Sequence, residues 1–229
     1  MGNRIEINLE FEESTKTKGK YLVFDTETTG LPINNNSPPD DFSNWPYIIQ
    51  IAWLLFDDEN KLIENSNFYL KQPVVIPVDA TNVHGITTEM MLKQGIEPPI
   101  VYANFKKAID NTEYLISHNI DFDVPIVHCD FLRNGMKWDF SNDKMFCTMK
   151  TGTRFCKIKK RNGEYKWPTL TELYQNCFFP GHTMNIYSDA TSTRNVHSAN
   201  IDAAMAAKCF FKLTLQRYMI YNSHLLSSV

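Results

Sequence analysis

Two acidic side chains stand close together where an apolar run ends, and their spacing indicates a metal site. Asp25 and Glu27 lie two residues apart, directly after the run from Lys20 to Phe24. Residues at positions i and i+2 of a strand point to the same side, so we expect both carboxylates on one face of a sheet. Carboxylates this close repel each other unless a cation lies between them. Mg²⁺ commonly binds such a pair together with a substrate phosphate, although a strand end that turns into solvent would also explain either acid alone.

Two more acidic residues and a histidine occur where helices are expected to begin. Asp123 closes the segment Ser117–Asp123, and Asp202 follows His197 by five residues. Each has an ordinary explanation when taken singly, because an acid in a first turn complements the helix dipole and a loop histidine needs only a hydrogen bond. Asp121 also competes with Asp123 for any functional role. Taken together, four carboxylates can meet at one sheet edge and hold two metal ions, with an imidazole beside them to accept a proton.

The elements that must position these residues are three strands followed by alternating helices and strands. Apolar and β-branched runs predict strands over residues 20–24, 47–56, 62–70, 114–117 and 144–148. Periodicity and capping residues predict helices over residues 87–94, 100–111, 122–134, 170–177 and 198–221. The first three strands make an antiparallel meander. We therefore predict an α/β fold, a mixed five-stranded sheet of this meander plus parallel strands, flanked by helices.

Three shorter segments carry local expectations. Residues 73–85 are expected to be irregular, and the Pro98-Pro99 pair to end the preceding helix. Asn162-Gly163 predicts a type I′ hairpin turn.

The composition is that of one folded domain with extensions. The chain has 229 residues and a net charge of −3, which fits a single domain. Its apolar runs are too short for a membrane span, and residues 1–13 lack an apolar signal core. Five cysteines without zinc-site spacing indicate reduced thiols in a cytoplasmic protein. We expect an N-terminal arm or extra strand over residues 1–19, the main domain over 20–222 and a tail over 223–229.

A basic segment interrupts this otherwise acidic chain. Seven basic residues and one acidic residue lie between Lys150 and Lys166. Such a patch can bind phosphate groups, and a solvated hairpin explains the charges equally well.

Four stretches of the sequence resemble, in order, the DEDDh group of DnaQ-like 3′–5′ exonucleases. They are Phe24–Leu31, Val83–Thr87, Ser117–Asp123 and His197–Asp202. The resemblance implies an RNase H-like fold over nearly the whole chain. Relative to a minimal family domain, the sequence has insertions at about 32–45, 150–167 and 179–196.

The resemblance also implies roles for individual residues. Two Mg²⁺ or Mn²⁺ ions would be bound by four ligands, which are Asp25, Glu27, Asp123 and Asp202, with His197 as the general base. A related subgroup has tyrosine four residues before the last aspartate, where this chain has Ser198, so the histidine version is indicated. The terminal nucleotide would be contacted by Thr28, Leu31, His84, Asn119 and Phe122.

The expected function is hydrolysis of the 3′ end of single-stranded nucleic acid, with release of nucleoside 5′-monophosphates. DNA is favoured over RNA because His84-Gly85-Ile86-Thr87 is most similar to polymerase-associated members. The incoming strand would be held by the basic segment, through Lys157, Lys159, Lys160, Arg161 and Lys166, with Tyr165 and Trp167 for base stacking. RNA 3′-end trimming or an oligoribonuclease activity is the first alternative. The second is a non-catalytic module that binds nucleic acid or a polymerase, which the five filled catalytic positions disfavour. Proofreading would need a separate DNA polymerase as partner, and the oligomeric state stays open.

Overall fold

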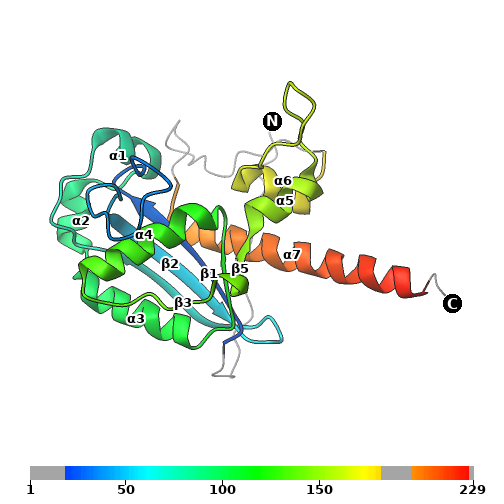
Figure 1. The fold of residues 1–229 in the computed structure, drawn as a ribbon, viewed down its shortest axis with the longest axis horizontal. Helices are drawn as coiled ribbons and strands as arrows, with labels where there is room; N and C mark the ends of the chain where they lie inside the picture. The colour runs from blue at the N-terminus through cyan, green and yellow to red at the C-terminus, as the bar shows by residue number, and fades with distance from the viewer. Residues whose placement is uncertain (1–18, 182–196, 227–229) are drawn as a thin grey trace, which may run out of the picture.

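The computed structural model describes residues 19–181 and 197–226, with side chains placed as far as residue 215. Its centre is a five-stranded mixed sheet in the order β3-β2-β1-β4-β5 (Figure 1). The strands are β1 (Tyr21–Thr28), β2 (Ile48–Phe56), β3 (Leu62–Tyr69), β4 (Tyr114–Ser117) and β5 (Met145–Cys147). β1, β2 and β3 form an antiparallel meander, and β4 and β5 run parallel to β1. The predicted fold class is confirmed.

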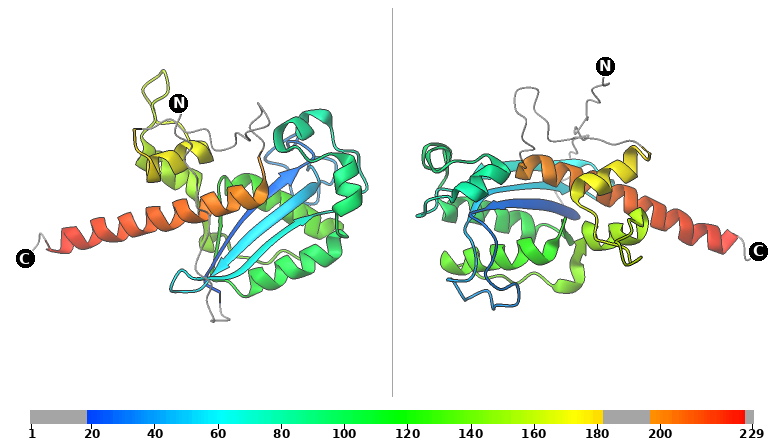
Figure 2. Two further views of the ribbon diagram at one scale, coloured as in Figure 1. Left: turned by 180° about the vertical axis from the view of Figure 1, so that it is seen from behind. Right: turned by 90° about the horizontal axis from the view of Figure 1, so that it is seen from above.

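Seven α-helices surround the sheet within the described residues. They are α1 (Val78–His84), α2 (Thr88–Gln94), α3 (Pro98–Asp110), α4 (Ile120–Arg133), α5 (Thr148–Cys156), α6 (Leu170–Phe178) and α7 (Ala199–Leu226), with a 3₁₀ turn η1 at Asn142–Lys144. Helices α3 and α4 cover one face of the sheet, and α7 crosses the opposite face (Figure 2). α7 continues past the edge of the sheet and ends five residues later than predicted.

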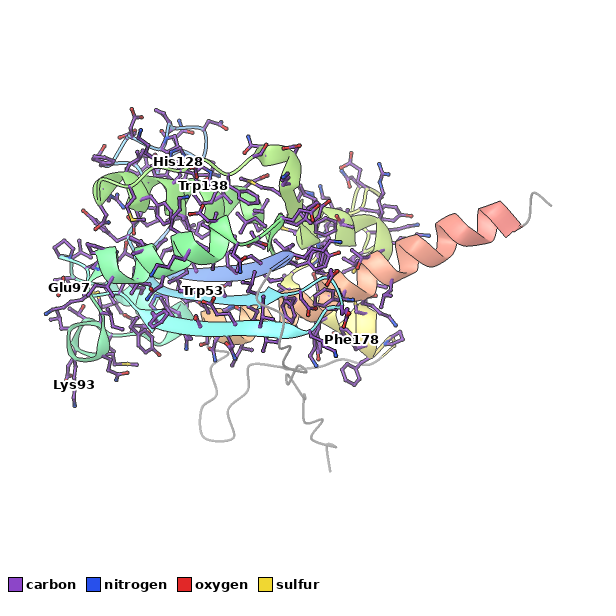
Figure 3. The ribbon with its side chains drawn as sticks, turned by 90° about the horizontal axis from the view of Figure 1, so that it is seen from below. Trp53, Lys93, Glu97, His128, Trp138 and Phe178 are labelled. Carbon is purple, nitrogen blue, oxygen red and sulfur yellow. The ribbon has the colours of Figure 1, made fainter. Side chains whose placement is uncertain are left out.

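Alternation along β1 and β2 divides the core into two layers (Figure 3). Leu22 and Phe24 pack with α3 and α4, whereas Val23 packs with α6 and α7. The first layer is rich in aromatic rings. The ring centre of Phe105 in α3 lies 5.4 Å from that of Phe24 and 5.1 Å from that of Trp53. Every residue of β2 is buried, as expected for the second strand of a sheet covered on both faces.

One local prediction about helices was wrong, and a second was confirmed in part. Residues 78–84, expected to be irregular, form α1, which ends where Gly85 takes a left-handed conformation with φ of 75°. Helix α2 ends at Gln94, before the Pro98-Pro99 pair, as predicted. The pair itself begins α3, two residues before the predicted start, because the first residues of a helix need no backbone N–H and proline already has a helical φ. The sequence also gave no signal for α5, which occupies the start of the basic segment.

The hairpin in the basic segment turns differently from the prediction. Lys160 N–H donates to the carbonyl of Glu164, and Gly163 N–H donates to the carbonyl of Lys160. Gly163 has φ of 86°, while Asn162 is not among the residues with positive φ. A type I′ turn needs positive φ at both central residues, so this loop is a type I turn followed by a glycine bulge.

The insertion at 32–45 is held against the domain by Arg133 of α4. The guanidinium donates to the carbonyls of Phe42, Trp45 and Pro46 and lies 4.0 Å from the ring centre of Tyr47. The side chain of Arg133 therefore anchors this insertion to α4. The expected N-terminal arm, most of the insertion at 179–196 and the end of the tail lie outside the described residues.

Candidate active site

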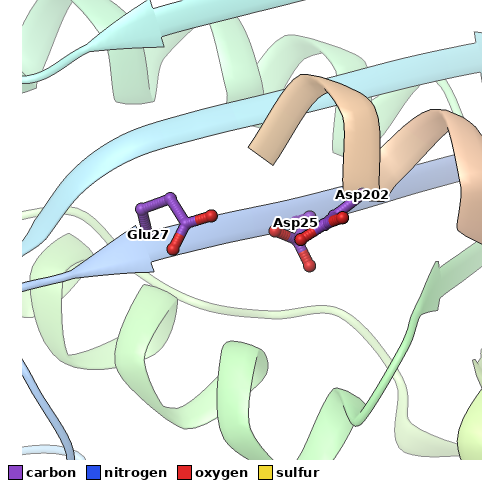
Figure 4. Close-up of side chains that lie close together, drawn as sticks. All are labelled: Asp25, Glu27 and Asp202. Carbon is purple, nitrogen blue, oxygen red and sulfur yellow. The ribbon is translucent and has the colours of Figure 1, made fainter. Parts of the chain in front are cut away.

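The end of β1 and the first turns of α7 bring three carboxylates together (Figure 4). Asp25 and Glu27 share one face of β1, where they lie opposite Ala52 and Gln50 of β2. Asp202 approaches the same face from α7. Each of the three offers a carboxylate oxygen within 4.8 Å of the others. Two predicted ligands from β1 and a third from a distant part of the sequence thus form one acidic cluster.

The fourth predicted ligand, Asp123, lies beside this cluster. It is not one of the three residues whose carboxylate oxygens lie within 4.8 Å of one another. It comes from α4, on the other face of the sheet, and is buried. The hydroxyls of Thr26 and Ser117 donate to its two oxygens at 2.8 Å and 2.6 Å. Its competitor Asp121 is exposed and pairs with Lys150 at 2.5 Å. The geometry therefore favours Asp123 over Asp121 as a member of the site.

The electrostatics of the cluster favour a bound cation. Desolvation, and then the charges of Asp123, Asp202 and Glu27, raise the pKa of Asp25 well above its ordinary value. Desolvation, followed by the charge of Asp202, raises the pKa of Glu27 to about 8. Desolvation raises the pKa of Asp123 to about 6, although its hydrogen bonds from Ser117 and Thr26 lower it. A divalent cation would relieve this repulsion, and the all-oxygen donor set suits Mg²⁺ or Mn²⁺.

His197 is held next to the carboxylates from two directions. Its Nδ1 lies 3.0 Å from Oδ2 of Asp202, and its backbone N–H donates to the carbonyl of Val83 in α1 at 3.1 Å. The hydrogen bond with Asp202 raises the pKa of the imidazole, and desolvation opposes it. A neutral ring that donates through Nδ1 presents Nε2 as its proton acceptor. The arrangement suits a general base.

These groups line one cavity of about 870 Å³. All five residues expected to contact the terminal nucleotide also line it, namely Thr28, Leu31, His84, Asn119 and Phe122. Leu31 is 81% exposed, so its side chain is available to a ligand.

His84 lines this cavity and has one ring nitrogen without a hydrogen-bond partner of good geometry among the described residues. Its Nδ1 accepts from the backbone of Ile86 at 3.0 Å. Its buried Nε2 has no hydrogen-bond partner of good geometry among the described residues. Burial lowers the pKa of this imidazole, while interaction with the backbone of Thr28 raises it. Burial thus disfavours the charged form of this ring, which lines the cavity.

The basic segment meets the cavity through one residue of the predicted set, Trp167. Trp167 is 63% exposed. Three basic side chains of this segment have acidic neighbours. Lys150 pairs with Asp121, Nζ of Lys166 lies 2.6 Å from Glu172, and Nζ of Lys160 lies 3.7 Å from Glu164. Five of the other six strand-binding candidates do not line the cavity, and these are Lys157, Lys159, Lys160, Arg161 and Tyr165. Lys166 does not line it either.

His118 is a site residue for which the sequence gave no role. Burial lowers the pKa of its imidazole to about 4, so the ring is neutral near pH 7. Its Nε2 lies 3.2 Å from the carbonyl of Pro168 and its Nδ1 lies 3.0 Å from the hydroxyl of Thr148. The ring thus links the end of β4 to the residue that follows Trp167. Its position between Ser117 and Asn119, inside a motif, was the available signal.

The chain matches a family model described as an exonuclease, the RNase T family, over residues 22–210. This match includes all four carboxylates and His197. The chain therefore belongs to this exonuclease family.

Related proteins include subunits of DNA polymerase III. Subunit epsilon of Buchnera aphidicola subsp. Schizaphis graminum is 29% identical over 208 residues, which are 90% of this chain and 79% of the relative. Subunit epsilon of Salmonella typhimurium is 26% identical over 201 residues, covering 85% of this chain and 71% of the relative.

Solved structures with the same fold include E. coli Exonuclease I. Its complex with a dT13 oligonucleotide has a TM-score of 0.64 at 18% identity, covering 91% of this chain and 44% of that chain. The chain therefore spans less than half the length of Exonuclease I, and at this identity the likeness concerns the fold. Among the helices that the structure describes, none is long and apolar enough to cross a membrane.

Proposed function

We propose that this protein is a metal-dependent 3′–5′ exonuclease that acts on single-stranded DNA and releases nucleoside 5′-monophosphates. The observation that carries this proposal is the meeting of Asp25, Glu27 and Asp202 in a cavity that also contains Asp123 and His197. The relatives support a DNA substrate. Subunit epsilon is named as part of a DNA polymerase, and the Exonuclease I complex holds a dT13 oligonucleotide.

The four carboxylates would hold two Mg²⁺ or Mn²⁺ ions. When bound, such ions lower the pKa of water and neutralise charge on the attacking and leaving oxygens. Asp25, Glu27 and Asp202 form the compact part of the ligand set. Asp123, whose two oxygens already accept hydrogen bonds, would complete it from the α4 side.

His197 would accept the proton of the attacking water. The water oxygen forms a bond to the phosphorus of the last phosphodiester, and the bond from that phosphorus to the 3′-oxygen of the preceding nucleotide breaks. The leaving oxygen takes a proton from solvent, so the products are a 5′-monophosphate and a strand shorter by one nucleotide. Asp202 stabilises the imidazolium that forms, since its Oδ2 lies 3.0 Å from Nδ1 of His197.

The terminal nucleotide would occupy the part of the cavity between β1 and α1. Leu31 and Phe122 offer apolar surface to the base, and the unsatisfied Nε2 of His84 offers a polar contact. Thr28 and Asn119 line the same space. Asn119 has a left-handed backbone with φ of 78° at the start of α4, which is the region of backbone that asparagine tolerates better than most residues.

The preceding nucleotides would pass along the basic segment. Trp167 can stack on a base at the cavity rim, and the nearby lysines contribute attraction for phosphate that falls with salt concentration. Because the epsilon relatives are polymerase subunits by name, a separate DNA polymerase is the proposed partner.

The test is degradation of oligonucleotides that carry a label at the 5′ end. The substrates are single-stranded DNA, single-stranded RNA and a duplex with a mismatched 3′ end, each assayed with Mg²⁺, with Mn²⁺ and with a chelator. We expect stepwise shortening of single-stranded DNA from the 3′ end that stops with the chelator. Faster shortening of RNA would replace the DNA assignment with RNA trimming. Binding without cleavage in either metal would leave a non-catalytic module as the correct description.

A further inference from the structure

Gln50 is a buried amide on β2 that connects the sheet to the start of α7. It is 1% exposed and lies directly opposite Glu27 in the β1–β2 pair. Its Oε1 accepts a hydrogen bond from the backbone N–H of Ala199 at 3.3 Å. Its Nε2 donates to Oδ1 of Asn67 on β3 at 2.8 Å. Among the described residues, Gln50 is not one that lines the cavity.

The hydrogen bond to Ala199 meets a need of the helix. The first N–H groups of an α-helix have no partner within the helix, and Ala199 is the first residue of α7. Ser198 stands at the position where a serine often caps a helix, but its hydroxyl donates to Oδ1 of Asn200 at 2.6 Å. A side chain from the sheet therefore supplies an acceptor for the helix start.

Small residues bring this helix start close to the sheet. Ala199 and Ala203 of α7 form a buried cluster with Ala52 of β2, and Ala52 is the strand partner of Asp25. Alanine side chains allow close approach, but they fix the position of a helix along a strand poorly because they interlock little. The hydrogen bond that Ala199 donates to Gln50 supplies a directional contact in this region.

The helix start carries two of the groups that the proposed mechanism uses. His197 precedes Ala199 by two residues, and Asp202 follows it by one turn. We propose that Gln50 is a positioning residue, which fixes the first turn of α7 so that Asp202 and His197 face the carboxylates of Asp25 and Glu27. This inference rests on the proposed function of the site. In the proposed mechanism, Gln50 contacts neither the substrate nor the metal ions. It acts through its hydrogen bond with Ala199.

The chemistry of the side chain explains why a neutral amide suits this position. The side chain must accept a hydrogen bond from Ala199 and donate one to Asn67. A carboxylate could accept but not donate, and it would add negative charge opposite Glu27. A hydrocarbon side chain could do neither.

The test compares Gln50→Leu with a matched control, Gln72→Leu. Gln72 is also a buried glutamine, with Nε2 donating to the carbonyl of Ile48 on β2 at 2.8 Å and to Asp130 at 3.2 Å. Its replacement removes a similar buried amide without touching α7. Gln50→Glu retains an acceptor for Ala199, and Asn67→Ala removes the group that orients Gln50 from an exposed strand position.

The first measurement is backbone hydrogen exchange in the metal-free protein, followed by mass spectrometry of peptides that cover residues 197–206. We expect Gln50→Leu to speed exchange in these peptides by about tenfold or more relative to peptides from α3, because the start of α7 should open locally more often. Asn67→Ala should produce a smaller change of the same sign. Gln50→Glu keeps the acceptor for Ala199 but loses the hydrogen bond to Asn67, so it should speed exchange less than Gln50→Leu does. Gln72→Leu should leave the ratio unchanged. If Gln50→Leu also leaves the exchange ratio unchanged, the positioning role is wrong. If Gln50→Leu does not fold, an unchanged exchange ratio in Asn67→Ala overturns the role.

The second measurement is Mn²⁺ affinity, obtained by titration without nucleic acid. Replacing a residue that orients metal ligands commonly weakens affinity by about 10- to 100-fold, and we expect a loss in that range for Gln50→Leu alone. In the nuclease assay, kcat should fall while KM changes little. If the wild-type protein cleaves neither DNA nor RNA, the proposed function fails, whereas the exchange and Mn²⁺ results still decide the role of Gln50. Equal Mn²⁺ affinity in wild type and Gln50→Leu would overturn that role.

Discussion

The two faces of strands β1 and β2 are built from alternate residues and do different work. On the face covered by α3 and α4, Phe24 and Trp53 pack with Phe105 in a layer of aromatic rings. Near the start of α7, the opposite face carries Asp25 and Glu27 together with Asp202, beside a small cluster of buried alanines. The same two strands thus provide a buried layer of aromatic rings on one side and, near the start of α7, a cluster of repelling charges on the other.

This difference shows where stability and chemistry come from in the protein. Apolar burial on the α3–α4 face supplies favourable free energy, while the carboxylates on the α7 face oppose folding until a cation neutralises them. The residues that face the aromatic layer and those that face the acidic cluster are direct neighbours along each strand. A register shift of one residue would exchange them, so the aromatic layer also fixes which side the acids face.

The largest expected effect is loss of activity on the acidic face. Asp202→Asn removes a proposed metal ligand and the partner of His197, so we expect the rate of 3′-end hydrolysis to fall by about 10³-fold or more. The melting temperature of the metal-free protein should not fall, because one of the repelling charges is lost. A gel assay and a thermal melt measure the two quantities. Asp121→Asn is the control, and near-wild-type activity in Asp202→Asn would contradict the metal assignment.

The next largest effect is expected on the aromatic face. Phe105 is fully buried, so Phe105→Ala should lower the free energy of unfolding by about 3–5 kcal/mol. Urea denaturation measures this loss, and Phe105→Leu should lose less because it leaves a smaller cavity. The activity of the molecules that remain folded should stay near that of wild type. A large fall in their activity would show that the two faces are not independent.

The charges on the acidic face should also make stability depend on pH. The pKa of Glu27 is raised from its usual value to about 8, so the folded state holds a proton that the unfolded state has already released. The metal-free protein should therefore lose stability as pH rises from about 5 to about 8. Thermal melts across this range should show the slope, and Mg²⁺ should reduce it by stabilising the ionised carboxylates. Glu27→Gln should have a shallower slope, and an equal slope in both proteins would remove Glu27 as a cause.

The smallest of these effects should come from the rim of the cavity. Trp167→Ala removes a proposed stacking surface, and one base stack is worth about 1–3 kcal/mol. We expect KM for single-stranded DNA to rise by about tenfold while kcat and thermal stability change little. Steady-state kinetics with a short and a long oligonucleotide would measure this. Phe178→Ala is a control at a partly exposed aromatic residue that does not line the cavity.

The sequence predicted the parts of the site that depend on short-range spacing. Asp25 and Glu27 share a face because a strand has a period of two, and Asp202 and His197 could be recognised from their place at a helix start. The sequence did not predict that Asp123 would lie beside the main cluster. That position depends on hydrogen bonds from Thr26 and Ser117, which no local pattern encodes.

Other features were missed for physical reasons that concern the tertiary structure. α1 has seven residues and follows Pro77, so it is too short for a periodic pattern to identify. Gln50 stands in an apolar run, where a neutral amide gives no sign that it will meet a distant helix. His118 likewise needed the position of Pro168, which is 50 residues away in sequence.

The hydrogen bond from His197 to Val83 has a consequence for fidelity. Val83 and His84 are neighbours at the end of α1, so the backbone that holds the histidine is joined to the wall that would touch the last base. A terminus that fits badly against His84 would strain α1 and pull the imidazole away from its working position. If the proposed function is correct, poorly seated ends would then be cut slowly even when they are bound.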